Sequence, residues 1–316
     1  ITATRTGAGK SPLTQFLARH LTDQGKKVAV IRHPMPYGNL EMQAVQRFAT
    51  PADLDRHECT IEEREEYAPY VDMGIPIFAG VDYQGILDES SREADIVMWD
   101  GGNNDFSFIK PDLDIVVVDA LRAGHEIDYF PGEVNFRRAD ILVIGKANSA
   151  APGAVEGIRE RAKALNPDAL IVTADLEVAI DRPELIEGRK VLVIEDGPTV
   201  THGGMAFGAG IVAAERQGAT PVEPRPYAVG TIADTYEAYP HMQRILPAMG
   251  YSEDQRQSLA ETINACAAAE KIACVVDASP ARLDRMLEID VPMVRVTYRF
   301  RQIDGDPIEE RVLGLI

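Results

Sequence analysis

The chain has 316 residues, of which 45% are apolar and 26% charged, a composition typical of globular proteins with a sizeable core. Asp and Glu outnumber Lys and Arg by 50 to 32, and this net charge of −18 argues against a general nucleic-acid binder, which would present a basic face. Three cysteines without a C-x-x-C motif support neither a disulfide framework nor a zinc finger. No apolar run approaches the ~18 residues of a membrane span and no signal peptide is recognised, so we expect a cytoplasmic protein without nucleic-acid or membrane partners.

Helix and strand patterns alternate along the first half of the chain. After Pro12, apolar residues recur at helical spacing from Leu13 to Leu21 and stop at Gly25. A further helix is predicted at 155–165, and runs rich in Val and Ile predict strands at 27–31, 94–99, 114–118, 139–144 and 169–172. Continuous apolar strands separated by helices predict an α/β fold with a mostly parallel sheet covered on both faces.

The second half of the chain is less regular. Helices are predicted at 211–217 and 252–269, and strands at 191–194, 229–232, 274–277 and 291–300. The length fits about two domains. We place their division near 181–187, which gives a nucleotide-binding core at 1–185 and a C-terminal α/β part that binds the substrate at 186–316, either separate from the core or continuous with it. A motif starts almost at Ile1, so we expect the first strand to be incomplete.

Acidic residues gather in the segment 53–72, where eight Asp and Glu residues accompany two Arg residues. This segment is either a solvated helix face or a mobile, charged flap beside a site.

Residues 4–11 read T-R-T-G-A-G-K-S, a P-loop with threonine in place of its first glycine. Gly7 and Gly9 allow the backbone to curl so that successive amides converge on phosphate oxygens, and the following helix adds positive potential. Lys10 is expected to reach the β- and γ-phosphates, and the Ser11 hydroxyl to ligate Mg²⁺. The predicted nucleotide-binding residues of this loop are Thr6, Gly7, Ala8, Gly9, Lys10 and Ser11.

Two later strands end in residues that suit the P-loop. Asp100 follows the strand at 94–99 and supplies the carboxylate that a P-loop requires to hold or orient magnesium. Asn103 and Asn104 come next, where open α/β sheets bind ligands, so we expect them to contact the substrate. Residues 144–148 read I-G-K-A-N, where guanine-specific P-loop proteins have N-K-x-D. Lys146 is expected to lie along the base, and the missing aspartate favours ATP over GTP.

Basic residues in loops are candidates for binding an anionic substrate. Arg32 and His33 follow the strand at 27–31, beside the P-loop, and suit a second anionic group. Arg137 and Arg138 form a pair whose guanidinium groups can hold a phosphate.

A second glycine-rich loop spans residues 201–210, between a predicted strand and a predicted helix. Its backbone amides either cradle an anion or form a tight turn beside a packed helix. Glu195 precedes this loop and is a candidate metal ligand.

Six segments together resemble the cyclic 2,3-diphosphoglycerate synthetase family, namely 5–11, 32–38, 44–50, 53–67, 99–106 and 195–205. The resemblance extends from the P-loop to about residue 300. It implies a P-loop NTPase-like fold, a further α/β domain before the P-loop and an ATP-dependent ligase. In the implied reaction, ATP phosphorylates one phosphate of 2,3-diphosphoglycerate, and the neighbouring phosphate then expels inorganic phosphate to close a ring.

The predicted site follows from these motifs and from the resemblance. The catalytic residues are Lys10, Asp100, Arg32, His33 and His202. The substrate contacts are Arg5, Arg32, His33, Asn103, Asn104, Arg137, Arg138, His202, Gly203 and Gly204. The metal ligands are Ser11, Asp100 and Glu195. We expect ATP and Mg²⁺, with K⁺ as a further candidate ion, a small phosphorylated substrate and a homodimer.

Two other functions remain open. One is another ATP-dependent ligase of the dethiobiotin-synthetase type, which also has a glycine-poor P-loop start. The other is a P-loop GTPase switch or metallochaperone, which the altered N-K-x-D motif and the lack of C-x-x-C disfavour.

Overall fold

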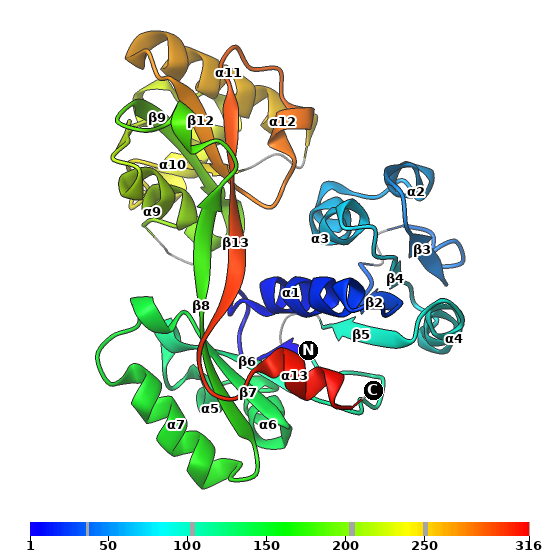
Figure 1. Cartoon of the computed structure of the whole chain (residues 1–316). Coiled ribbons are helices and arrows are strands. Elements are labelled where there is room, and N and C mark those ends of the chain that lie inside the picture. Colours follow the sequence, from blue (N-terminus) through cyan, green and yellow to red (C-terminus); the bar gives the residue numbers. More distant parts are fainter. Residues whose placement is uncertain (36–37, 102–104, 202–205, 249–251, 316) are drawn as a thin grey trace. The chain divides into compact units, whose positions relative to one another are not determined.

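The computed structural model describes residues 1–35, 38–101, 105–201, 206–248 and 252–315 (Figure 1). It divides into two compact units. The first comprises Ile1–Cys59, Tyr67–Glu177 and Arg299–Ile316, and the second comprises Thr60–Glu66 and Val178–Tyr298. No helix among the described residues has the length and apolarity that a membrane crossing requires.

The first unit contains a mostly parallel sheet. One set of strands has the order β1-β6-β7-β8, with β1 (Thr2–Ala3), β6 (Ile115–Asp119), β7 (Ile141–Gly145) and β8 (Leu170–Ile180). The other has the order β3-β4-β2-β5, with β3 (Gln46–Phe48), β4 (Ile77–Ala79), β2 (Val28–Arg32) and β5 (Ile96–Asp100). Ile1 connects the two sets, since its nitrogen donates to Trp99 and its carbonyl accepts from Gly101. Within these two sets the paired strands are parallel except β3 and β4, so the predicted mostly parallel arrangement is confirmed.

Helices cover both faces of this sheet, because the buried strands carry apolar residues on both sides. In β2, Val28 and Val30 share a core with Leu13 and Leu17 of α1, whereas Ala29 and Ile31 pack with α4. The helices of this unit are α1 (Lys10–Asp23), α2 (Pro51–Arg56), the later part of α3 (Ile61–Asp72), α4 (Tyr83–Glu93), α5 (His125–Asp128), α6 (Gly132–Arg138), α7 (Ala154–Leu165) and α13 (Ile308–Leu313).

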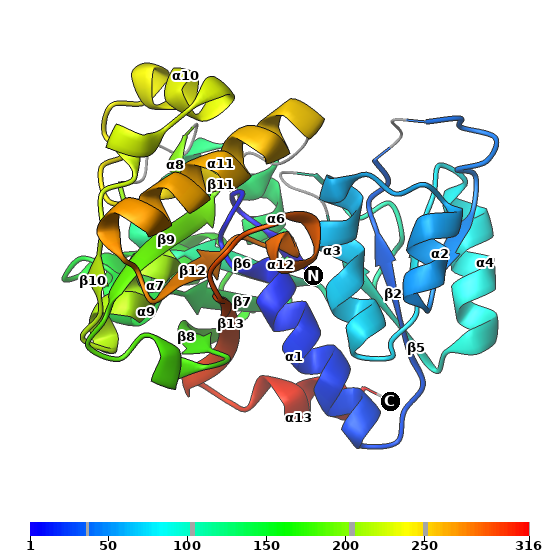
Figure 2. The same cartoon turned by 90° about the horizontal axis from the view of Figure 1, so that it is seen from above.

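The second unit is a smaller α/β structure (Figure 2). Its buried apolar side chains form one core. Its strands are β9 (Lys190–Asp196), β10 (Thr220–Pro221), β11 (Leu246–Ala248), β12 (Cys274–Ala278) and the first half of β13 (Met293–Asp304), in the order β13-β12-β9-β10 with β11 also paired to β9. Its helices are α8 (Gly197–Val200), α9 (Ala209–Arg216), α10 (Gly230–Ala238), α11 (Glu253–Glu270) and α12 (Leu283–Met286). Both α9 and α11 contact β9.

Two sequence predictions differ from the structure. The expected strand at 229–232 is wrong, because this segment starts helix α10. Ile232, Thr235 and Tyr236 are buried at helical spacing, so the apolar run belongs to a longer pattern with a period of 3.6 residues. The expected division at 185/186 instead falls at 177/178, and 299–316 returns to the first unit. The divisions lie inside the long strands β8 and β13, so no linker composition marks them.

The acidic segment contains two buried carboxylates rather than only solvated ones. Asp53 accepts hydrogen bonds from the amides of Ala49 and Thr50 and from the Thr50 hydroxyl. The Ala49 amide is the main cause that lowers the pKa of Asp53 to about 2. Glu63 accepts from the Thr60 amide at 2.8 Å. These two acids therefore stabilise helix N-termini, which a count of charges does not reveal.

Candidate functional site

The P-loop connects β1 to α1 as the motif predicts. The Thr4 amide donates to Val117 in β6 at 2.9 Å, which continues the β1 pairing into the loop. Gly7 and Gly9 have φ values of +76° and +108°, where a side chain would be strained, and Gly9 directly precedes α1. The loop with Thr6 and Ala8 therefore ends at a helix N-terminus, a geometry that binds phosphate.

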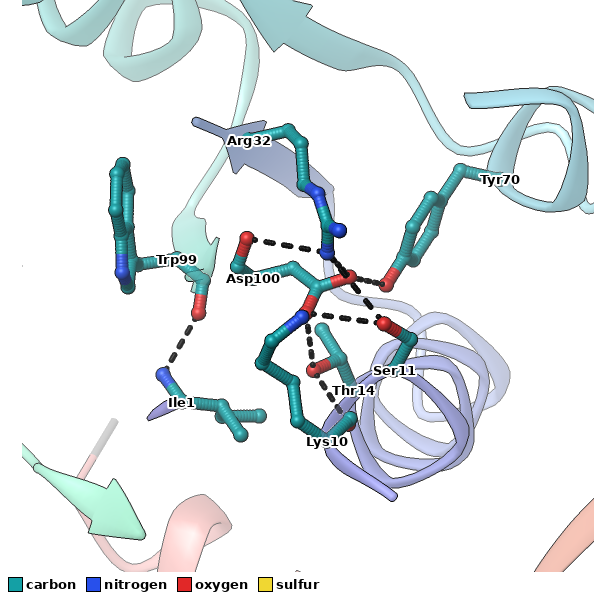
Figure 3. A network of polar contacts seen from close by, with 8 residues as sticks. All are labelled: Ile1, Lys10, Ser11, Thr14, Arg32, Tyr70, Trp99 and Asp100. Carbon is teal, nitrogen blue, oxygen red and sulfur yellow. Dashed lines mark hydrogen bonds and ion pairs between the residues drawn. The ribbon is translucent and has the colours of Figure 1, made fainter. Parts of the chain in front are cut away.

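Five side chains converge on the carboxylate of Asp100 (Figure 3). Lys10 Nζ lies 3.4 Å from Oδ1, and Arg32 Nη1 lies 2.9 Å from Oδ2. The Tyr70 hydroxyl donates to Oδ2 at 2.7 Å. Ser11 and Thr14 complete the network with hydroxyl contacts of 3.4 and 3.5 Å to Oδ1.

Pairing of β2 with β5 produces this arrangement. Arg32 and Asp100 are opposite each other in the parallel register and are the last residues of their strands. Both therefore lie at the carboxyl edge of the sheet, where open α/β sheets bind ligands. The sequence predicts Lys10, Arg32 and Asp100 for this site, and the structure brings them together.

The charges around Asp100 keep it ionised. Burial raises its pKa, but Lys10, Arg32 and the Tyr70 hydrogen bond together lower it to about 2. Burial, followed by the nearby Asp100 charge, raises the pKa of Tyr70 well above its usual 10, so this phenol is a fixed hydrogen-bond donor. Lys10 and Arg32 are only 7% and 4% exposed, so the site concentrates positive charge in a protein whose total charge is negative.

The donor set beside the P-loop fits Mg²⁺. Ser11 supplies a hydroxyl oxygen and Asp100 a carboxylate, 3.4 Å apart, and magnesium prefers oxygen ligands. These two residues would hold the ion. When bound, it would neutralise charge on the phosphate oxygens.

A second group of side chains supports the back of the P-loop. Asp119, the last residue of β6, contacts Lys146 at 3.0 Å and Arg122 at 2.7 Å. Lys146 also donates to the Gly7 carbonyl at 2.6 Å, and Arg122 donates to the Thr6 carbonyl at 2.5 Å. The sequence predicts Lys146 for this region but not Asp119 or Arg122. Asp119 could have been predicted, because it is an acid at the end of β6, the strand that pairs with the P-loop strand β1.

Two further predicted residues lie in loops of the same unit. Arg5, in the P-loop, holds its Cζ 3.8 Å from the centre of the Tyr129 ring. His33 follows β2 directly, and its Nε2 lies 3.8 Å from Oδ2 of Asp105, in the loop after β5. Asp105 was not among the predicted site residues.

Two predicted residues, Arg137 and Arg138, have other roles in the structure. Arg137 pairs with Glu133 at 2.7 Å and Arg138 with Asp114 at 3.1 Å. This pair ends α6, just before β7 begins, so it lies at the amino edge of the parallel strands, whereas the P-loop lies at the carboxyl edge. The expectation that the pair binds substrate phosphate is therefore wrong.

Glu195 is a helix anchor in the second unit rather than a metal ligand. Its Oε1 accepts from the amides of Gly208 and Ile211, at 3.1 and 2.9 Å. Burial raises its pKa to about 7, which disfavours the ionised form that a metal requires. Five further predicted residues lie outside the described part of the chain, namely Asn103, Asn104, His202, Gly203 and Gly204.

The strand, loop and helix around Lys10, with Asp100 on a neighbouring strand, define a P-loop nucleotide-binding enzyme. Its fold is similar to that of LpxK from Aquifex aeolicus in complex with ATP, with a TM-score of 0.58 at 11% identity over 99% of this chain and 86% of that one. HypB from Archaeoglobus fulgidus matches at a TM-score of 0.35 and 19% identity over 55% of this chain and 81% of its own, which is too low to bear on the fold.

The chain is 52% identical over 314 residues to arginine synthetase ArcE from Thermococcus kodakarensis, a match that covers 99% of this chain and 69% of that protein. It belongs to the family of this synthetase. No protein-family model matches the chain. None of these relatives is named as a cyclic 2,3-diphosphoglycerate synthetase.

Proposed function

We propose that this protein is an ATP-dependent ligase that forms arginine. The observation that carries the proposal is the 52% identity to arginine synthetase ArcE along nearly the whole chain. The P-loop and the buried network around Asp100 support it, because a synthetase of this fold would use ATP as a phosphoryl donor.

The chemistry of arginine limits the acceptor. A phosphoryl group transferred from ATP turns an oxygen into a good leaving group, which a nitrogen nucleophile then displaces. At the guanidino carbon of arginine, the displaced oxygen must come from a ureido group. A ureido amino acid is therefore the proposed acceptor, and a nitrogen nucleophile is the second substrate.

Residues around the P-loop can bind the phosphates of ATP and stabilise the negative charge on the transferred phosphoryl group. The P-loop amides and Lys10 would bind the β- and γ-phosphates, in place of the present contact between Lys10 and Asp100. Arg32 lies between Asp100 and Ser11 and would stabilise charge on the transferred group. Arg5 would bind the substrate at the mouth of the loop. The catalysis is positioning and charge neutralisation rather than covalent attack by the protein.

Cyclisation of 2,3-diphosphoglycerate is the second candidate. The six segments named above support it, as they resemble the family that carries this activity. Both reactions proceed by phosphorylation of an oxygen and displacement of inorganic phosphate, so one P-loop site suits either.

Product analysis distinguishes the two candidates. The purified full-length protein is incubated with ATP and Mg²⁺, either with a ureido amino acid and ammonium or with 2,3-diphosphoglycerate. Amino-acid analysis for arginine and ³¹P NMR for a cyclic anhydride follow the products. Arginine in the first mixture, lost in Lys10→Ala, supports the proposal. A cyclic anhydride with no arginine would overturn it in favour of cyclisation.

A further inference from the structure

His33 and Asp105 lie at the carboxyl edge of the sheet, the edge at which Asp100 also lies. His33 directly follows β2, and Asp105 lies five residues after the end of β5. Since β2 and β5 pair with Arg32 opposite Asp100, the residues after both strands leave the sheet at the same edge. His33 and Asp105 therefore lie at the same edge as the phosphate-binding residues.

When His33 is neutral, the pair consists of two hydrogen-bond acceptors that face each other. His33 Nδ1 lies 3.0 Å from the Pro34 carbonyl, which can only accept, so Nδ1 carries a proton. In the neutral ring, Nε2 then presents a lone pair. It lies 3.8 Å from Oδ2 of Asp105, which is too far for a hydrogen bond.

Among the described residues, no hydrogen-bond donor reaches the Asp105 carboxylate. Both of its oxygens are buried, and neither has a hydrogen-bond partner among the residues that the structure describes. A buried carboxylate oxygen without a donor is costly and rare in folded proteins. A molecule that donates to both Nε2 and Oδ2 would therefore satisfy this pair.

A small nitrogen cation meets this requirement. A nitrogen atom about 2.8 Å from each of two acceptors 3.8 Å apart has hydrogen-bond distances to both. Phe108 provides a fixed wall, because its ring lies 6.1 Å from the His33 ring and packs against Tyr83 and Trp99. The described residues contain no group of three His, Cys, Asp or Glu side chains that could hold a metal ion.

We propose that His33 and Asp105 bind the nitrogen nucleophile and that His33 removes its proton. This inference rests on the proposed arginine-forming function. Asp105 holds the ammonium ion, and Nε2 of His33 takes one proton to release ammonia. The ammonia nitrogen bonds to the central carbon of the phosphorylated ureido group, and the C–O bond breaks with its electron pair on phosphate. A second nitrogen proton leaves with the phosphate, and His33 returns its own proton to solvent.

Two nucleophiles test the role of His33. Ammonia is mostly protonated at neutral pH, whereas hydroxylamine is mostly neutral and needs no base before it attacks. In the full-length protein, we expect His33→Gln to lower arginine formation from ammonium by about 100-fold or more, a usual contribution of general base catalysis. Formation of the hydroxylated product from hydroxylamine should retain most of its rate. An equal loss with both nucleophiles would overturn the inference.

Asp105→Asn tests the binding role separately. The KM for ammonium should rise about tenfold or more, as expected for loss of a hydrogen bond to a charged group, while the KM for ATP stays unchanged. Asp112→Asn, an exposed aspartate before β6, is the matched control and should change neither value. An unchanged KM for ammonium in Asp105→Asn contradicts the inference. If wild type forms no arginine, the proposed function fails; if wild type forms arginine and both variants match it, only this inference fails.

Discussion

Replacing Asp100 by asparagine removes a negative charge that Lys10 and Arg32 share. Both cations are almost fully buried, so the variant leaves them close together without this counter-charge. Breaking a buried ion pair in this way costs about 3–5 kcal/mol. The pKa of Asp100 gives a smaller value for the stabilisation that this residue contributes. Its decrease from 3.8 to about 2 corresponds to about 2 kcal/mol at neutral pH. We therefore expect Asp100→Asn to destabilise the first unit by about 2–5 kcal/mol.

Trp99 offers a direct assay. It is the single tryptophan of the chain, it is 8% exposed, and it precedes Asp100 in β5. Urea unfolding followed by its fluorescence should show a lower midpoint for Asp100→Asn at pH 7. Asp112→Asn is the control and should match wild type.

The pH dependence gives a second check on the same variant. The folded pKa of Asp100 is below its unfolded value, so its stabilisation is complete above about pH 4 and is lost as the pH falls towards 2. The difference between wild type and Asp100→Asn should shrink over that interval. A variant whose midpoint equals that of wild type at pH 7 would refute the assignment of Asp100 as the counter-charge.

Three further variants test other contacts. Tyr70→Phe removes the donor to Asp100, and we expect about 1.5–3 kcal/mol lower stability in urea, with no loss if the phenol is unimportant. Lys146→Met removes the contact with the Gly7 carbonyl, so the KM for ATP should rise while the melting curve stays close to wild type; an unchanged KM contradicts a role in holding the loop. Glu195→Gln mimics the protonated form of Glu195, whose pKa is raised from 4.5 to about 7. Ionisation of Glu195 therefore lowers the folding stability of the wild-type protein as the pH rises from 4.5 through 7. This variant should be about 3 kcal/mol more stable than wild type at pH 8 and similar at pH 4, as calorimetry can measure, and lower stability at both pH values would count against the raised pKa.

Local sequence patterns predict most of the first unit. Buried parallel strands need Val and Ile on both faces, so the apolar runs at 114–118 and 139–144 identify β6 and β7 directly. The P-loop is also local, because its glycines, its lysine and its helix start are consecutive in sequence.

Contacts between distant segments were harder to predict. Tyr70 reaches Asp100 from a helix 30 residues away, in a segment that the sequence marks only by its acidic residues. Arg137 is a residue whose type predicts phosphate binding but whose position excludes it. It precedes β7 and therefore lies at the amino edge of the parallel strands, opposite the edge that carries the P-loop. The expected homodimer, K⁺ and cytoplasmic location stay predictions.

The contact between Lys10 and Asp100 makes nucleotide and divalent ion depend on each other. The lysine now rests on the carboxylate, and it must exchange that partner for phosphate when ATP binds. If the nucleotide bound alone, the Asp100 carboxylate would lie beside the negative charge of the phosphates without its lysine partner. If the divalent ion bound alone, it would compete with Lys10, which already neutralises that carboxylate. Each ligand thus removes an obstacle to the other, and thermodynamic linkage requires that the two affinities rise by the same factor. We therefore expect the ion pair to make the loop cooperative towards the nucleotide–metal complex and selective against either component alone.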